Sequence, residues 1–259
     1  MKLKTPAEEF EKMQKNNDIA KENENAAEAA LGLKKNTDKK AADMTPMTFD
    51  EQYKTKILLV RHGESIGNAT RTFLGHTDRD LSERGYAQAA RTDEFLKNEK
   101  IDKVYTSDLI RAYNTALPHA KRRGLDAVSQ KELREMFAGE WENRKVEDIM
   151  DLYGDSFTVG WRENFGVYTI PGGESPDIAV NRFYNAVLKI AKYNEGKTVL
   201  IGSHAAVIRL FFGKIRNIAQ KDLAAAFLYP TNASVSVVYF DGEKLIPGEY
   251  SHDAHLSDI

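Results

Sequence analysis

Five residues with side chains suited to anion binding or proton transfer follow apolar runs in this sequence. Arg61 and His62 come directly after one such run, while Arg111, Glu135 and His204 come after three others. Apolar runs of this length are typical of buried strands, and the carboxyl ends of parallel strands meet at one edge of a sheet. The sequence therefore predicts that two arginines, two histidines and one carboxylate share a pocket.

The chemistry that suits such a pocket is phosphoryl transfer. Two guanidinium groups and a second imidazole match a phosphate dianion through charge-assisted hydrogen bonds. Backbone N–H groups at helix starts near Gly63 and Ala205 would add to this anion site. A neutral His62, with one ring proton held by a backbone carbonyl, presents its other nitrogen to phosphorus. Glu135 is the candidate that protonates the leaving oxygen and then activates water against the phosphohistidine.

Each of these residues also has an ordinary interpretation when it is taken alone. An arginine after a strand commonly forms a surface ion pair, a lone histidine is commonly structural, and Glu135 alone is commonly solvated. A metal site made of His62, Glu64 and His76 fits no standard ligand spacing, so no metal and no cofactor are predicted. The repeated placement at strand ends is what favours a shared site.

The elements that must position these residues alternate along the chain. Strand patterns cover residues 56–60, 103–106, 127–133, 198–202, 234–240 and 244–246. Helix patterns cover residues 81–96, 108–122, 175–193 and 205–212. This alternation predicts an α/β domain with a mostly parallel sheet. The Asp241-Gly242 turn between the last two strands predicts one antiparallel strand at an edge.

Composition narrows the function classes further. The chain has 259 residues and a formal net charge of −2, which gives no general attraction to nucleic acid or membranes. It has no cysteine, which excludes thiol catalysis, disulfides and zinc–cysteine sites. No apolar stretch approaches the ~20 residues that span a bilayer, and the first residues lack the apolar core of a secretion signal. We therefore expect a cytoplasmic enzyme with a small phosphorylated substrate as its partner; the sequence leaves its oligomeric state open.

The chain divides near residue 50. Residues 1–50 are rich in Lys, Glu, Asn and Ala and contain few large apolar side chains. They have too little apolar surface for a fold of their own, so we predict a polar extension that is mobile or loosely helical. The alternative is a docking or lid segment. Residues 51–259 form the predicted α/β domain.

Six segments between about residues 56 and 256 resemble the histidine phosphatase superfamily, also called the phosphoglycerate mutase-like family. The first of them, Arg61-His62-Gly63-Glu64-Ser65 with Asn68, is the most specific, because it follows a buried strand. The others are Gly75-His76-Thr77-Asp78 with residues 81–89, Thr106-Ser107-Asp108-Leu109 with Arg111, Leu133-Arg134-Glu135-Met136 with Trp141 and Glu142, residues 171–175, and Ser203-His204 with residues 207–209.

The resemblance implies a fold and a set of roles. The fold is a three-layer α/β/α sandwich, and the family needs no metal. His62 is implied as the phosphorylated nucleophile and Glu135 as the proton donor. Arg61, Arg111 and His204 are implied to bind the phosphoryl group, and Asn68 is implied to assist. Ala205 is the further phosphate contact that the helix start after His204 predicts.

The reaction expected from this set is hydrolysis of a phosphomonoester through a phosphohistidine. The alternatives are a phosphoglycerate mutase on the same site and a non-catalytic phosphate-binding protein. Mutases of the family carry adjacent arginines after a cap Trp, whereas this chain reads Trp161-Arg162-Glu163, and an acidic group there should repel a bound carboxylate. Residues 139–171 predict a mixed aromatic and basic cap able to hold sugar phosphates, phosphoglycerates or larger organic phosphates.

Overall fold

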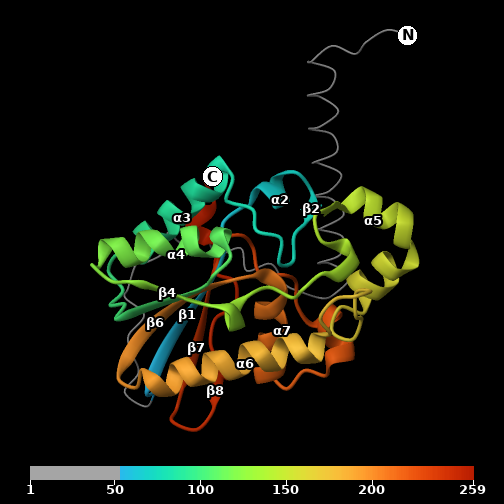
Figure 1. Ribbon diagram of the computed structural model, residues 1–259. Coiled ribbons are helices and arrows are strands. Elements are labelled where there is room, and N and C mark those ends of the chain that lie inside the picture. The colour runs from blue at the N-terminus through green and yellow to red at the C-terminus, as the bar shows by residue number, and fades with distance from the viewer. Residues whose placement is uncertain (1–52) are drawn as a thin grey trace. The chain divides into compact units, whose positions relative to one another are not determined.

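A six-stranded sheet forms the centre of the domain in a computed structural model that describes residues 53–259 (Figure 1). The strands lie in the order β4-β3-β6-β1-β7-β8. The first four are mutually parallel, β7 runs antiparallel to β1, and β8 runs antiparallel to β7. The predicted α/β class with a mostly parallel sheet and an antiparallel edge is confirmed. Their bounds are β1 Thr55–Arg61, β3 Lys103–Ser107, β4 Ala127–Gln130, β6 Lys197–Ser203, β7 Val235–Phe240 and β8 Leu245–Pro247.

Helices cover both faces of this sheet, which gives the three layers (Figure 1). Ile57 and Leu59 of β1 pack into the larger core with α6 and α7, while Leu58 and Val60 pack into the second core with α4. All four side chains are fully buried, as a strand covered on both faces requires. The helices of the outer layers are α3 Glu83–Phe95, α4 Ile110–Arg122, α6 Pro176–Tyr193 and α7 Ala205–Ile215.

Local sequence signals set the starts of two of these helices. The Ser82 hydroxyl accepts the Gly85 N–H at 3.1 Å and caps α3. Ser175 caps α6 in the same way, and Pro176 occupies the first helical turn, where its missing N–H costs nothing. The predicted helix beginnings are accordingly confirmed to within two residues.

The strand predicted over residues 127–133 is wrong in its second half. Strand β4 ends at Gln130, and the chain continues as the 3-10 helix η1, Lys131–Leu133. This turn carries the chain out of the sheet, and the Ser203 hydroxyl at the end of β6 donates to the Leu133 carbonyl at 2.8 Å. The early end of β4 therefore places Glu135 above the carboxyl ends of the central strands.

A cap follows β4 and has an aromatic core of its own. Trp141 contacts the rings of Phe73, Tyr153, Phe157 and Trp161 with centroids 5.5 to 6.0 Å apart. Two-residue strands and a π-helix carry no strong periodicity, which is why the sequence patterns did not reveal them. The elements of the cap are η2 Gly139–Trp141, β5 Arg144–Lys145, α5 Val146–Tyr153 and the π-helix η3 Ser156–Glu163. Strand β5 pairs with β2, Thr72–Phe73, which lies earlier in the chain.

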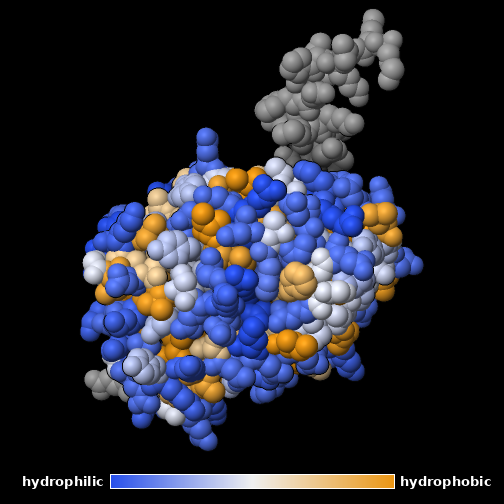
Figure 2. Space-filling model, in the orientation of Figure 1, coloured by the Kyte–Doolittle hydropathy of each residue, from blue (hydrophilic) through white to orange (hydrophobic). Residues whose placement is uncertain are grey.

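Four short elements complete the domain: α2 Ile66–Ala69, η4 Gln220–Asp222, α8 Leu223–Ala226 and η5 Ala254–Leu256. Figure 2 shows a face that is mostly hydrophilic, with apolar residues in small separate groups. Within residues 53–259, no helix has both the length and the apolar character needed to cross a membrane. The predictions for residues 1–50 lie outside the described residues.

Candidate active site

A cavity of about 480 Å³ opens at the carboxyl ends of the parallel strands. Arg61, His62, Arg111 and Glu135 all line it. The fifth predicted residue, His204, is fully buried beside His62, with ring centroids 5.2 Å apart. The structure thus brings together the five residues that the strand-end argument selected.

Parallel pairing of β1 with β6 explains why the two histidines meet. Arg61 lies opposite Ser203 in the register, so His62 and His204 both follow the last paired position. The His62 N–H donates to the Ser203 carbonyl at 2.9 Å, which extends the ladder by one bond. The two imidazoles therefore start from adjacent points of the sheet edge.

The ring of His62 is held in one tautomer. Its Nδ1 lies 2.7 Å from the Gly63 carbonyl oxygen, which only accepts, so Nδ1 carries the proton and Nε2 keeps its lone pair. Burial, together with the charges of Arg111 and Arg61, lowers the pKa of His62 well below its usual value. The imidazole is therefore neutral at pH 7, as a nucleophilic nitrogen must be.

His204 is neutral for the same reasons. Burial and the nearby charge of Arg111 lower the pKa of His204 well below its usual value. Neither of its ring nitrogens has a hydrogen-bond partner within residues 53–259, and the same holds for Nε of Arg61. Buried polar atoms normally have partners, so these atoms are available to the oxygens of a bound phosphoryl group.

Two guanidinium groups, of buried Arg111 and half-buried Arg61, face this pair. Arg111 is 2% exposed, and it donates to the carbonyls of Gly75 at 2.7 Å and Thr77 at 3.0 Å. Arg61 donates through Nη1 to the Pro230 carbonyl. Burial lowers the pKa of Arg61 to about 10 and also lowers that of Arg111, which leaves Arg61 charged at pH 7.

The loop that holds Arg111 is itself fixed by a carboxylate. Glu142 accepts the backbone N–H groups of His76 at 2.7 Å, Thr77 at 2.6 Å and Ala138 at 2.9 Å. Gly75 has φ +49, and a Cβ atom there would lie 2.0 Å from the Glu142 carboxylate. Glycine is therefore required at this position for the carbonyls to reach Arg111.

Glu135 binds the beginning of α7. Its carboxylate oxygens accept the backbone N–H groups of Ala206 at 3.0 Å, Val207 at 3.1 Å and Met136 at 2.9 Å. Ala205 lines the cavity as predicted, but the N–H groups that follow it are taken by Glu135. A helix N-terminus attracts any nearby anion, and here the anion is a side chain of the same protein.

The backbone donors near Gly63 are likewise unavailable. The Gly63 N–H donates to the Thr115 hydroxyl at 3.0 Å, and the Glu64 N–H donates to the Gln88 side chain at 2.8 Å. The N–H groups of Gly63, Glu64, Ala206 and Val207 are therefore already bound within the protein. The backbone contribution to the anion site that remains a prediction is the N–H of Ala205, at the cavity wall.

Asn68 lies at the cavity wall, as predicted. Its Oδ1 accepts the backbone N–H of Ser65 at 3.0 Å, and its backbone N–H donates to the Ser65 hydroxyl oxygen at 3.1 Å. These bonds form the capping box of α2 and fix the orientation of the amide. The Nδ2 group is left as the donor that Asn68 offers to a ligand.

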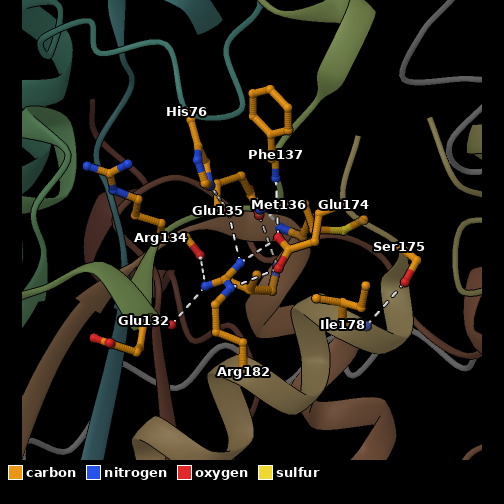
Figure 3. A network of polar contacts seen from close by, with 12 residues as sticks. His76, Glu132, Arg134, Glu135, Met136, Phe137, Glu174, Ser175, Ile178 and Arg182 are labelled. Carbon is orange, nitrogen blue, oxygen red and sulfur yellow. Dashed lines mark hydrogen bonds and ion pairs between the residues drawn. The ribbon is translucent and has the colours of Figure 1, made fainter. Parts of the chain in front are cut away.

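Sequence reasoning missed a network that holds the Glu135 loop (Figure 3). Arg182 of α6 donates to the carbonyls of Glu132 at 2.8 Å, Arg134 at 3.0 Å and Glu135 at 3.2 Å. It also forms a bidentate pair with the Glu174 carboxylate at 2.9 and 2.7 Å. All five guanidinium N–H donors are used, and they fix the backbone beneath Glu135.

The cap differs from the expectation in its basic residues. Trp161, Val146 and Ile170 line the cavity, whereas Arg144, Lys145 and Arg162 do not. Arg144 donates to the Glu140 carbonyl at 2.6 Å, and Lys145 donates to the Thr70 carbonyl at 2.7 Å. The predicted mixed aromatic and basic cap is corrected, because the cap contributes apolar side chains to the cavity wall.

The geometry defines the class as an α/β protein with two histidines, two arginines and a carboxylate at the strand ends of one cavity. Residues 57–249 match the model of the histidine phosphatase superfamily (branch 1), and the chain belongs to that superfamily. Within residues 53–259, no three His, Asp or Glu side chains gather as a metal site.

Three similar proteins extend this comparison. Phosphoserine phosphatase 1 of Hydrogenobacter thermophilus is 30% identical over 205 residues, which cover 79% of this chain and 95% of that protein. A 2,3-bisphosphoglycerate-dependent phosphoglycerate mutase of Corynebacterium diphtheriae is 30% identical over 198 residues, which cover 65% of this chain and 80% of that protein. The structure of Bacillus stearothermophilus YhfR has a TM-score of 0.74 and 27% identity, and the match covers 78% of this chain and 100% of that one.

Proposed function

We propose that this protein hydrolyses monoesters of phosphate with small organic alcohols, through a phosphohistidine on His62 and without a metal. The observation that carries the proposal is that the His62 ring is neutral and fixed in one tautomer. Its Nδ1 is held by the Gly63 carbonyl, its Nε2 keeps a lone pair, and the charges of Arg61 and Arg111 act on it. A fixed neutral imidazole beside two guanidinium cations is the arrangement that attack on phosphorus requires.

The reaction proceeds in two steps. In the first, Nε2 of His62 forms a bond to phosphorus as the bond to the alcohol oxygen breaks. Arg61, Arg111 and His204 bind the three equatorial oxygens, and Glu135 gives the departing oxygen its proton. In the second step, Glu135 takes a proton from water, whose oxygen displaces His62 and releases inorganic phosphate.

Hydrolysis is favoured over isomerisation by the charges around the cavity. A mutase needs cations for the second phosphate and the carboxylate of its bisphosphorylated intermediate. Arg162 and Glu163 are exposed and do not line the cavity, so the repulsion that the sequence suggested for Glu163 does not operate there. The apolar wall disfavours a bisphosphorylated intermediate instead, since Arg71 is the sole cation beyond the phosphate end within the described residues.

The experiment that tests the proposal compares two rates on 3-phosphoglycerate, with and without added 2,3-bisphosphoglycerate. Phosphate release is followed by a colorimetric assay, and conversion to 2-phosphoglycerate by a coupled assay. We expect phosphate release to exceed interconversion. Interconversion faster by orders of magnitude would identify a mutase, and binding of phosphorylated compounds without turnover of any ester would identify a phosphate-binding protein.

Arg182 gives a separate prediction, because it reaches the reaction only through Glu135. Arg182→Gln removes the guanidinium hydrogen bonds that hold the Glu135 loop. It should lower kcat on an alkyl phosphate about 100-fold, with KM nearly unchanged. Release of p-nitrophenol in the first turnover of p-nitrophenyl phosphate should be much less affected, because this leaving group needs no proton. Steady-state kinetics on the alkyl ester and stopped-flow absorbance on p-nitrophenyl phosphate measure the two effects.

Arg122→Gln is the matched control for this variant. Arg122 pairs with Asp93 at 2.7 Å on the outer surface of α4 and contacts no residue of the cavity. Its removal should leave both rates within about twofold, as expected for a partly exposed ion pair. Equal losses in kcat on the alkyl ester and in the first-turnover rate on p-nitrophenyl phosphate would show that Arg182 serves only the stability of the fold.

A further inference from the structure

The cavity has two ends of different character. The phosphate end contains His62, Arg61, Arg111 and Glu135. The other end is formed mainly by apolar side chains from residues 67–75, from Met136 next to Glu135 and from the cap. These side chains are Phe73, Leu74, Met136, Val146, Trp161 and Ile170.

This apolar end is built into the fold. Trp161 is 8% exposed and Leu74 is 8% exposed, while Met136 and Ile170 are almost fully buried. The ring of Phe73 packs edge-on against Trp161, with centroids 5.4 Å apart. The wall is therefore fixed by the same aromatic packing that holds the cap together, and a ligand meets preformed apolar surface.

The positive charge of Arg71 at the apolar end is compensated by a carboxylate of the protein. Arg71 is the cation that lines it within residues 53–259, and its Nε lies 2.9 Å from the Glu147 carboxylate. The Arg71 side chain is 68% exposed, so it lies at the solvent-facing rim. A carboxylate of a substrate that entered the apolar end would lose water without gaining a free cation, which is unfavourable.

We infer that the apolar end binds an uncharged, apolar alcohol portion, so that the preferred substrates are phosphate monoesters of apolar alcohols and not phosphorylated acids. This inference rests on the proposed phosphatase function and goes beyond it by naming the substrate class. It separates this chain from the relative named as a phosphoserine phosphatase, because phosphoserine carries a carboxylate and an ammonium group next to its ester.

The test compares butyl phosphate with 4-phosphonooxybutanoate on the full-length protein. The two esters have the same number of carbons, and they differ by the terminal carboxylate. We expect kcat/KM to be about 100-fold or more higher for butyl phosphate, and to rise about fourfold per methylene from ethyl to butyl phosphate. Equal values for the two four-carbon esters, or faster turnover of O-phosphoserine than of butyl phosphate, would overturn the inference.

Two variants test whether the preference for butyl phosphate arises at the apolar wall. Val146→Lys places a cation on the apolar wall and should narrow the preference for butyl phosphate at least about tenfold. Val159→Lys places the same charge on η3 at a side chain that is 45% exposed and lies off the cavity, so the preference should not change. An unchanged preference in both variants would contradict the assignment of this wall to the alcohol portion.

Turnover of p-nitrophenyl phosphate distinguishes failure of the proposed phosphatase function from failure of the inferred substrate class. If the native protein hydrolyses it and His62→Ala does not, the phosphatase function stands, and the ratio between the butyl esters decides the substrate class alone. If no ester is hydrolysed, the proposed function fails and the substrate class fails with it.

Discussion

His62→Ala is expected to lower kcat on phosphate monoesters by about 10⁴-fold or more, because it removes the atom that attacks phosphorus. The residual cations of the cavity bind the phosphoryl group but supply no nucleophile. Rapid quenching of the native protein with a ³²P-labelled ester should trap one labelled histidine. The label should be lost in acid and kept in base, as expected for a phosphorus–nitrogen bond, and peptide mapping should place it on His62.

His252→Ala is the matched control for the nucleophile. His252 stacks on Phe95 at 5.1 Å between ring centroids and pairs with Glu249 at 2.8 Å, and it does not line the cavity. This variant should keep its turnover and its labelling. Native activity in His62→Ala, or a label that maps to another residue, would exclude the phosphohistidine mechanism on His62.

The strand-end residues of the site can be predicted from sequence for a physical reason. A strand buried on both faces reads as a continuous apolar run, and parallel pairing brings the residues after such runs to one edge. Arg61 opposite Ser203 is the direct consequence. The predicted convergence depends on topology alone, so it survives errors of a few residues in the bounds of each element.

The residues that orient this site are not predictable in the same way. Arg182 lies 47 to 50 positions from the carbonyls that it holds, and Arg111 lies 34 to 36 positions from its own. Carbonyl acceptors are present at every residue, so no residue type marks the ones that are used. Such contacts depend on how loops fold over one another, which a single sequence does not encode as a local pattern.

The cap shows a second limit. Its aromatic residues suggested contacts with a substrate, yet Trp141, Phe157 and Phe165 are buried in its core. Large aromatic side chains bury apolar area wherever they lie, so their presence alone does not separate a cavity wall from a core. The division between Trp161, which lines the cavity, and Trp141, which does not, required the three-dimensional structure.

Glu135→Gln is expected to lower kcat/KM on an alkyl phosphate by about 10² to 10⁴-fold, because an amide neither donates an acidic proton nor accepts one from water. p-Nitrophenolate leaves without a proton, so the first step on p-nitrophenyl phosphate should survive while the second is slowed. We therefore expect a stoichiometric burst of p-nitrophenol followed by a slow steady state, measured by stopped-flow absorbance, with the phosphorylated protein accumulating.

The glutamine variant also changes the packing at α7, so stability must be measured beside activity. Glu135 accepts N–H groups with both oxygens, and the amide nitrogen of glutamine cannot accept the one from Ala206. Leaving that N–H without a partner should cost about 1–3 kcal/mol of unfolding free energy. Glu140→Gln, on an exposed glutamate that accepts the Tyr153 hydroxyl at 2.8 Å, should change neither quantity much. If Glu135→Gln slows both esters equally and no phosphorylated protein accumulates, Glu135 acts through the position of α7 and not as the acid and base of the reaction.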